Sequence, residues 1–224
     1  LPGLSRLAAA IKAEGSIAVV QLHHAGMRSP RELIGEAPVC PSDNEEFGAR
    51  ALTAAEVERL RDDFIAAGVR ARKAGFDGVE IHGAHGYVLC QFLSAGINRR
   101  EDDWGGSLDN RGRLIRDILA AIRAECGPDF QIGLRLSPER FDLDLPEIRR
   151  FAGALMFHGA IDYLDMSLWD VAKLPADEAY QERPLIDWFT DLPRGDCRLG
   201  VAGKIGVDLV LLPAEVFSLQ PVRG

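Results

Sequence analysis

The sequence is poor in cysteine and contains no long apolar run. Its four cysteines are widely separated among 224 residues and form no C-x-x-C motif, so they offer no ligand set for zinc or an iron–sulfur cluster. No stretch approaches the roughly 20 apolar residues that a membrane span needs, and the first residues do not open a signal peptide. We therefore expect a cytoplasmic protein with reduced thiols and no membrane partner.

Positive charge is also scarce. The chain has 26 Lys and Arg against 34 Asp and Glu, a formal net charge of −8. A surface that binds nucleic acid needs clustered basic side chains, so we expect no nucleic-acid partner and a small molecule instead. With 47% hydrophobic and 27% charged residues, the composition is that of an ordinary globular protein. We expect a single domain over residues 1–224, and self-association into a homo-oligomer stays open.

A glycine-rich dinucleotide-binding fingerprint is missing after every predicted strand, which removes the sequence support for a Rossmann fold. Instead, strand patterns alternate with helical patterns. Strands are predicted over residues 17–22, 78–81, 131–136, 161–167, 198–202 and 208–212. Helices are predicted over residues 4–13, 53–74 (opened by a capping box of Thr53 and Glu56), 107–126 (capped by Ser107), 148–156 and 185–189. Strands separated by helices pair in parallel, so the predicted fold class is α/β.

The most informative segment is the run His-Gly-Ala-His-Gly-Tyr over residues 82–87, reached directly from the predicted strand 78–81. His82 and His85 are spaced so that both can reach a substrate carbonyl oxygen and stabilise the charge that develops when hydride adds to the β-carbon. Tyr87 has a phenol that stays protonated at neutral pH and can donate to the α-carbon. No side chain carries a hydride, so such a site needs a redox cofactor. A cation shared by the two histidines is an alternative, but no third ligand stands nearby, and we predict no metal.

Two polar residues interrupt otherwise apolar strands, Gln21 and Arg135. Burying an unpaired guanidinium costs several kcal/mol, roughly, so an anionic or carbonyl-rich group should face Arg135. A bound ligand is one candidate, and a neighbouring carboxylate such as Asp165 is the other. His23 and His24 follow Gln21, and at most one of them faces the substrate because adjacent strand residues point to opposite sides.

The run over residues 82–87, taken together with four later segments, resembles the Old Yellow Enzyme family of FMN-dependent ene reductases and NAD(P)H:flavin oxidoreductases. These segments are Gln91–Ser94, Asn98–Arg100, Asp103–Ser107 and Asn110–Arg111. The resemblance implies a (β/α)₈ TIM barrel, FMN as cofactor, NAD(P)H as reductant and an alkene conjugated to a carbonyl or nitro group as substrate. It implies that His82, His85 and Tyr87 are catalytic and that Gln21, Arg135 and Gly203 bind FMN. The loop of residues 98–104 is expected to be a structural support that an Arg–Asp pair stiffens.

The resemblance also has departures that concern both ends of the chain. Six strands are predicted where the barrel needs eight, and the match begins at the family's third strand, so the first two strands are expected to be missing. The connection between 198–202 and 208–212 is too short for a parallel crossover, and residues 212–214 lack the family's phosphate-binding arginine. Two explanations stay open. The sequence is an excerpt of a longer reductase, or it is a catalytically silent barrel remnant without stable flavin binding.

Overall fold

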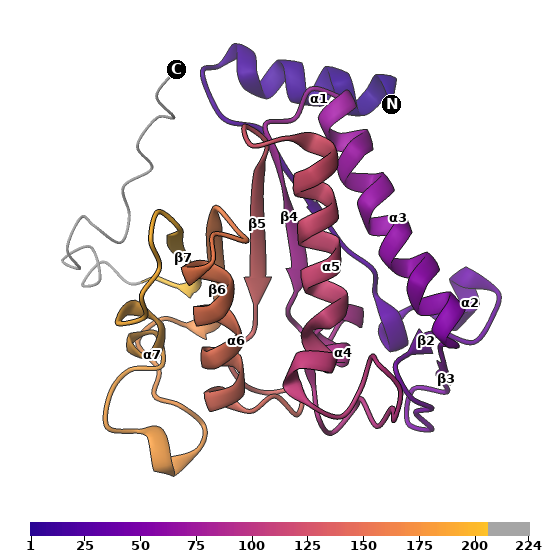
Figure 1. Ribbon diagram of the computed structural model, residues 1–224, viewed down its shortest axis with the longest axis vertical. Helices are drawn as coiled ribbons and strands as arrows, with labels where there is room; N and C mark the ends of the chain where they lie inside the picture. Colours follow the sequence, from indigo (N-terminus) through magenta and orange to yellow (C-terminus); the bar gives the residue numbers. More distant parts are fainter. Residues whose placement is uncertain (206–224) are drawn as a thin grey trace.

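A five-stranded parallel sheet forms the centre of the computed structural model, which describes residues 1–205 (Figure 1). Its strand order is β1-β4-β5-β6-β7. The strands are β1 (Val19–Leu22), β4 (Gly78–Gly83), β5 (Gln131–Leu136), β6 (Tyr163–Asp170) and β7 (Arg198–Lys204). All four pairings are parallel, which confirms the predicted α/β class. The predicted strand 208–212 lies outside the described residues.

The helices are α1 (Pro2–Ala13), α2 (Arg31–Ile34), α3 (Ala54–Lys73), α4 (Val88–Leu93), α5 (Leu108–Cys126), α6 (Leu145–Phe157) and α7 (Asp187–Thr190), with short 3₁₀ turns at Gly26–Arg28 and Glu178–Tyr180. Helices α3 and α5 begin where the sequence predicts them to begin, α1, α6 and α7 begin two or three residues away from the predicted starts, and α2 and α4 were not predicted. The capping box of Thr53 and Glu56 opens α3, and Ser107 caps α5 by accepting the Asn110 N–H. Within residues 1–205 no helix has both the length and the apolar character that crossing a membrane requires.

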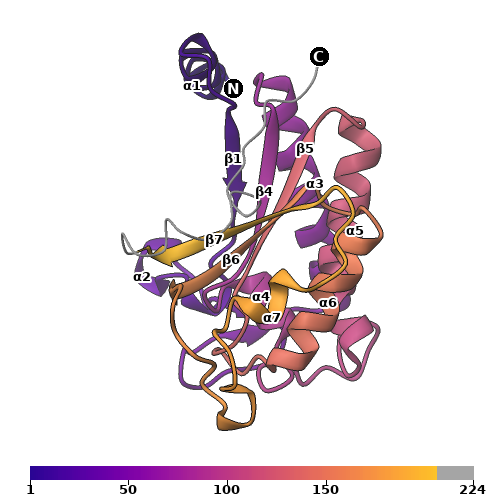
Figure 2. The ribbon, with the colours of Figure 1, turned by 90° about the vertical axis from the view of Figure 1, so that its left-hand side faces the viewer.

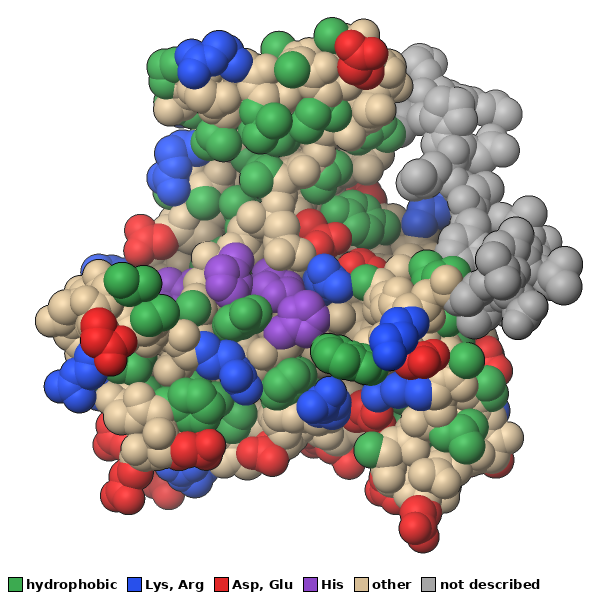
Figure 3. Space-filling model, turned by 180° about the vertical axis from the view of Figure 1, so that it is seen from behind, with side chains coloured by type: hydrophobic (Ala, Val, Ile, Leu, Met, Phe, Trp, Pro, Cys, Tyr) green, Lys and Arg blue, Asp and Glu red, His purple; other side chains and the backbone are tan. Residues whose placement is uncertain are grey.

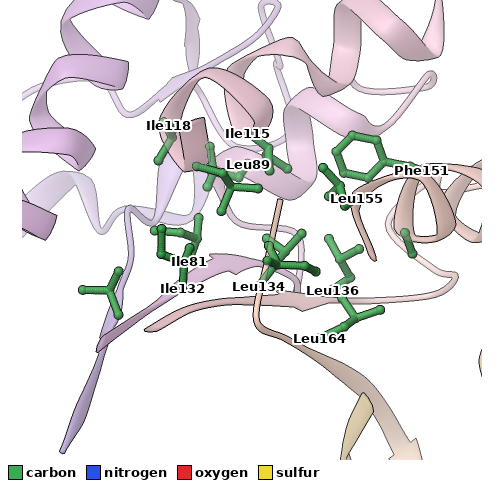
Figure 4. Packing of buried hydrophobic residues seen from close by; sticks show 14 of the residues in the cluster. Ile81, Leu89, Ile115, Ile118, Ile132, Leu134, Leu136, Phe151, Leu155 and Leu164 are labelled. Atoms are coloured by element: carbon green, nitrogen blue, oxygen red, sulfur yellow. The ribbon is translucent and has the colours of Figure 1, made fainter. Parts of the chain in front are cut away.

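The two faces of the sheet differ in chemistry. Helices α3, α5 and α6 cover one face (Figure 2), and the residues of β4, β5 and β6 that point to it are apolar and fully buried. Ile81, Ile132, Leu134 and Leu136 pack there against helical residues such as Ile115 (Figure 4). Burial of each such side chain stabilises the folded state by about 1.5–3 kcal/mol. The alternate strand residues point to the opposite, polar face: Gln21, Glu80, His82, Arg135, Asp165 and Ser167.

Several predicted boundaries need correction. Strand β4 continues to Gly83, so His82 lies inside the strand rather than after it. Strand β6 covers 163–170 instead of 161–167 because a register shift between Ser167 and Trp169 lets pairing with β7 continue. Between β1 and α3, where no strand was predicted, the chain forms a small two-stranded sheet of β2 (Val39–Cys40) and β3 (Arg50–Ala51).

The loop of residues 98–104 is stiffened as predicted, but by a different pair. Arg100 binds Asp102 through two hydrogen bonds of 2.9 and 2.5 Å, rather than Asp103. The same guanidinium donates to the carbonyl oxygens of Pro41 and Leu52. Buried Asn98 donates to two further carbonyl oxygens. These side chains therefore hold neighbouring loops together.

The four cysteines are all buried and free.

Candidate active site

The turn after β4 positions the predicted catalytic residues. His82 is the fifth residue of β4 and is only 4% exposed. His85 adopts a left-handed backbone conformation with φ of 60°, which is uncommon for a residue with a side chain and is typical of functional sites. Its backbone N–H donates to Ser137 Oγ at 3.0 Å, which ties the turn to the end of β5. Tyr87 follows as the N-cap residue of α4.

The structure brings His82, His85 and Tyr87 together. His82 Nε2 lies 3.2 Å from His85 Nδ1. The Tyr87 ring is 5.3 Å from the His82 ring and 6.3 Å from the His85 ring, measured between centroids. His23 joins this cluster, with its ring 4.3 Å from Tyr87 and 5.3 Å from His82. Figure 3 shows histidines gathered in the middle of the face that lies opposite the helices, with basic side chains beside them.

Both central histidines are held neutral. Burial lowers the pKa of His82 to about 3, and the neighbouring His85, His23 and Arg135 act in the same direction. Burial also lowers the pKa of His85, and the charge of Arg135 adds to that shift. Each ring therefore carries a single N–H at neutral pH. Such rings act as hydrogen-bond donors of fixed orientation rather than as cations.

The lowered pKa of His82 predicts a loss of stability in acid. Between about pH 6.5 and 3, His82 binds a proton in the unfolded state but stays neutral in the folded state. The free energy of unfolding therefore decreases as the pH falls. We expect wild-type unfolding free energy to fall by about 1 kcal/mol per pH unit more than that of His82→Asn between about pH 6 and 4. Urea titrations at several pH values measure this slope. The exposed His158→Asn is the matched control and should keep the wild-type slope. Equal slopes in wild type and His82→Asn would show that His82 is not the residue whose lowered pKa destabilises the protein in acid.

Arg135 has the carboxylate neighbour that its position allowed, and its contact with a ligand stays a prediction. Its Nε lies 3.2 Å from Asp165 Oδ2, within ion-pair distance, but the two atoms form no hydrogen bond. Nη2 donates to Ser167 Oγ at 3.2 Å. Burial raises the pKa of Asp165, although the charge of Arg135 opposes that shift. Arg135 thus has a carboxylate neighbour and still presents a buried Nε without a hydrogen-bond partner among residues 1–205.

A cleft of about 680 Å³ opens beside this cluster at the C-terminal ends of β5, β6 and β7. His85, Arg135 and Gly203 all line it. So do four further cationic side chains, from Arg28, Arg140, Lys173 and Lys204. Glu139, the one carboxylate in this lining, already accepts hydrogen bonds from Lys173 Nζ and the Ala176 N–H, at 2.6 and 2.7 Å. The cleft therefore favours an anionic ligand.

These residues fit FMN. The guanidinium of Arg135, which lines the cleft, can meet the carbonyl-rich edge of the flavin ring, and the cations at the strand ends suit a phosphate. Gln21 lies outside this lining, exposed on β1, where its Nε2 donates to Glu80 Oε1 at 2.6 Å. Gly203 also has a structural reason to be glycine, because a Cβ there would lie 3.1 Å from the backbone of Trp169 in the β6 bulge. The FMN contacts of Arg135, Gln21 and Gly203 stay predictions.

Sequence reasoning missed Ser167 and left His23 without a role. Ser167 Oγ contacts both His85 and Arg135. The period of two along a strand could have found both residues, because His23 lies two positions after Gln21 and Ser167 two after Asp165. The other histidine of the pair, His24, accepts the Gly26 N–H instead. Within residues 1–205 no group of three or more His, Cys, Asp and Glu could hold a metal ion.

Comparisons with known proteins agree with this geometry. Residues 1–183 match the NADH:flavin oxidoreductase / NADH oxidase family. A relative from Bacillus subtilis strain 168, the probable NADH-dependent flavin oxidoreductase YqiG, is 43% identical over 240 residues, covering 97% of this chain and 64% of the relative. The chain therefore spans less than two thirds of that relative's length.

Solved structures show the same arrangement of strands and helices. The Old Yellow Enzyme homologue from Zymomonas mobilis superposes with a TM-score of 0.76 at 27% identity, covering 92% of this chain and 61% of that one. Morphinone reductase in complex with tetrahydroNAD superposes with a TM-score of 0.75 at 28% identity, covering 92% and 60%. The five-stranded sheet therefore corresponds to part of a TIM barrel, which confirms the predicted incomplete (β/α)₈ fold.

Proposed function

The chain belongs to the NADH:flavin oxidoreductase / NADH oxidase family. We propose that it is part of an FMN-dependent oxidoreductase of the ene-reductase type. Such an enzyme passes a hydride from NAD(P)H, by way of FMN, to the C=C bond of an alkene conjugated to a carbonyl or nitro group. The observation that carries the proposal is the pair of neutral histidines 3.2 Å apart, with Tyr87 packed beside them. Residues 1–224 would then form part of a single FMN-binding barrel domain.

The side chains divide the chemistry among themselves. FMN, when bound, supplies the hydride that no side chain can carry. His82 and His85 donate hydrogen bonds to the substrate oxygen, which orients the alkene and stabilises the negative charge that develops on that oxygen. Tyr87 donates its phenolic proton to the α-carbon. Arg135 places a positive charge beside the ring edge, and Gln21 offers its amide to the same edge.

The surroundings of the site support a small-molecule partner. The cleft has room for a ligand, and its basic lining suits the phosphate of FMN or another anionic group. The buried, free cysteines fit a reducing compartment, so we place the protein in the cytoplasm. The activated alkene is the proposed substrate class.

An anaerobic absorbance experiment tests the proposal. The purified chain is mixed with FMN, freed of unbound flavin, reduced with NADPH or NADH and then mixed with cyclohexenone. We expect retained flavin that bleaches and is reoxidised by one equivalent of the enone. Cyclohexanone, which has the same carbonyl but no alkene, is the matched control and should leave the flavin reduced.

Two other outcomes would contradict the proposal in different ways. If the chain retains no flavin, it is the catalytically silent barrel remnant, or a fragment that lacks stable flavin binding, which the sequence also allows. If NAD(P)H bleaches retained flavin but no conjugated alkene reoxidises it, the chain is a flavin oxidoreductase with a different electron acceptor.

A further inference from the structure

Ser167, on β6, connects two residues of the proposed site. Its Oγ lies 2.6 Å from His85 Nε2 and 3.2 Å from Arg135 Nη2. A guanidinium can only donate, so one lone pair of Oγ accepts from Arg135. The hydroxyl has one proton of its own to donate. Among residues 1–205, His85 Nε2 is the one hydrogen-bond partner of Ser167 that can accept it.

This donation decides which nitrogen of His85 carries the proton. A neutral imidazole has one N–H and one bare nitrogen, so a ring that accepts at Nε2 must be protonated at Nδ1. We propose that Ser167 is a positioning residue that holds His85 in its Nδ1–H tautomer, with that proton directed toward His82. The proposal deepens the proposed function and rests on it for its catalytic meaning.

The Nδ1–H tautomer matters because of what faces it. His85 Nδ1 is 3.2 Å from His82 Nε2, and His82 Nδ1 is buried without a hydrogen-bond partner among the described residues. Without a ligand, the His85 Nδ1–H donates to a bare His82 Nε2, and His82 then carries its proton at the unpartnered Nδ1. A buried N–H without an acceptor is costly, so His82 is better protonated at Nε2 once a substrate oxygen is present to accept that proton. Both facing nitrogens then carry protons. An oxygen about 2.8–3.0 Å from each would accept from both.

Such a pair of donors selects the substrate by its oxygen. A carbonyl or nitro oxygen has two lone pairs and no proton, and it can accept both N–H groups at once. If His85 took the other tautomer, its bare Nδ1 would face that oxygen, and two electron-rich atoms would repel each other. Ser167 therefore acts through His85 rather than on the substrate, and Arg135 assists by turning the hydroxyl proton toward His85.

Nitrogen-15 NMR of the histidine rings tests this assignment directly. The chain contains five histidines, so selective labelling yields five pairs of ring-nitrogen signals, and the pair lost in His85→Asn identifies His85. Spectra at neutral pH report which ring nitrogen carries the proton. We expect Nδ1–H in wild type and a shift toward Nε2–H in Ser167→Ala. Ser167→Thr keeps the hydroxyl and should keep Nδ1–H.

A matched control separates the ring contact from general support of the turn. Ser137 holds the backbone N–H of His85 rather than its ring, so Ser137→Ala should leave the tautomer as it is. In flavin-loaded protein we expect Ser167→Ala to slow alkene reduction about tenfold, the usual effect of one neutral hydrogen bond, and Ser167→Thr to restore it.

The NMR test of the tautomer and the turnover test of alkene reduction can fail independently of each other. A wild-type His85 protonated at Nε2, or a tautomer that does not change in Ser167→Ala, would overturn the positioning role. The tautomer is read without turnover. If it responds as expected while no conjugated alkene is reduced, the positioning role stands and the proposed reaction fails.

Discussion

Replacing Arg135 by methionine is expected to abolish FMN retention and to lower the free energy of unfolding by about 2–3 kcal/mol. The stability loss follows because Asp165, largely buried at 3.2 Å from Arg135 Nε, would lose its counter-charge. The flavin loss follows because the cleft would lose the guanidinium that donates to Ser167 beside His85. Fluorescence titration of FMN and urea unfolding measure the two effects separately.

A double variant distinguishes the two roles of Arg135. In Arg135→Met/Asp165→Asn no carboxylate is left unpaired, so we expect stability to recover most of the loss while FMN retention stays abolished. If the double variant binds FMN like wild type, Arg135 is only the structural partner of Asp165. The flavin site must then be sought among the other basic residues of the cleft.

Tyr87→Phe is expected to slow alkene reduction about 100-fold or more while leaving flavin reduction by NAD(P)H largely intact. The substitution keeps the ring that packs on His23 and His82 and removes only the phenolic proton. General acid catalysis contributes about 10²–10⁴-fold, and only the alkene half-reaction needs that proton. Stopped-flow absorbance of the flavin follows the two half-reactions one at a time.

The control for this variant is Tyr180→Phe. Tyr180 is also half-buried, but it packs on Trp188 away from the histidines, so its loss of a hydroxyl should alter neither half-reaction. An equal slowing of both half-reactions in Tyr87→Phe would show that Tyr87 supports the pocket instead of donating the proton.

Local sequence patterns predicted the five strands of the main sheet and the longer helices, because each of these depends on neighbouring residues, but they missed α2, α4, β2 and β3. The capping box of Thr53 and Glu56 and the cap at Ser107 mark helix starts by contacts within three residues. The apolar residues of β4 and β5 predicted where these strands lie in the sequence, because both strands are buried on the helix-covered face. The end of β4 was harder to predict, since His82 pairs with Arg135 of β5 and pairing partners are not adjacent in sequence.

Contacts between distant residues could not be predicted in the same way. The polar loop was predicted to contain an Arg–Asp pair, yet the choice of Asp102 over Asp103 depends on where the loop places Arg100 relative to Pro41 and Leu52. Trp169 is a similar case. Its left-handed φ of 67° belongs to a bulge that exists only because β6 pairs with β7.

The sequence by itself determined the α/β class, the family resemblance and the grouping of His82, His85 and Tyr87, because strand period and short spacing are local properties. The tertiary structure alone decided that Ser167 lies between His85 and Arg135 and that His23 packs on Tyr87. It also decided that Gln21 is bound to Glu80. These contacts join different strands or the turns that follow them, and their partners are set by the register in which parallel strands pair, which no short stretch of sequence encodes.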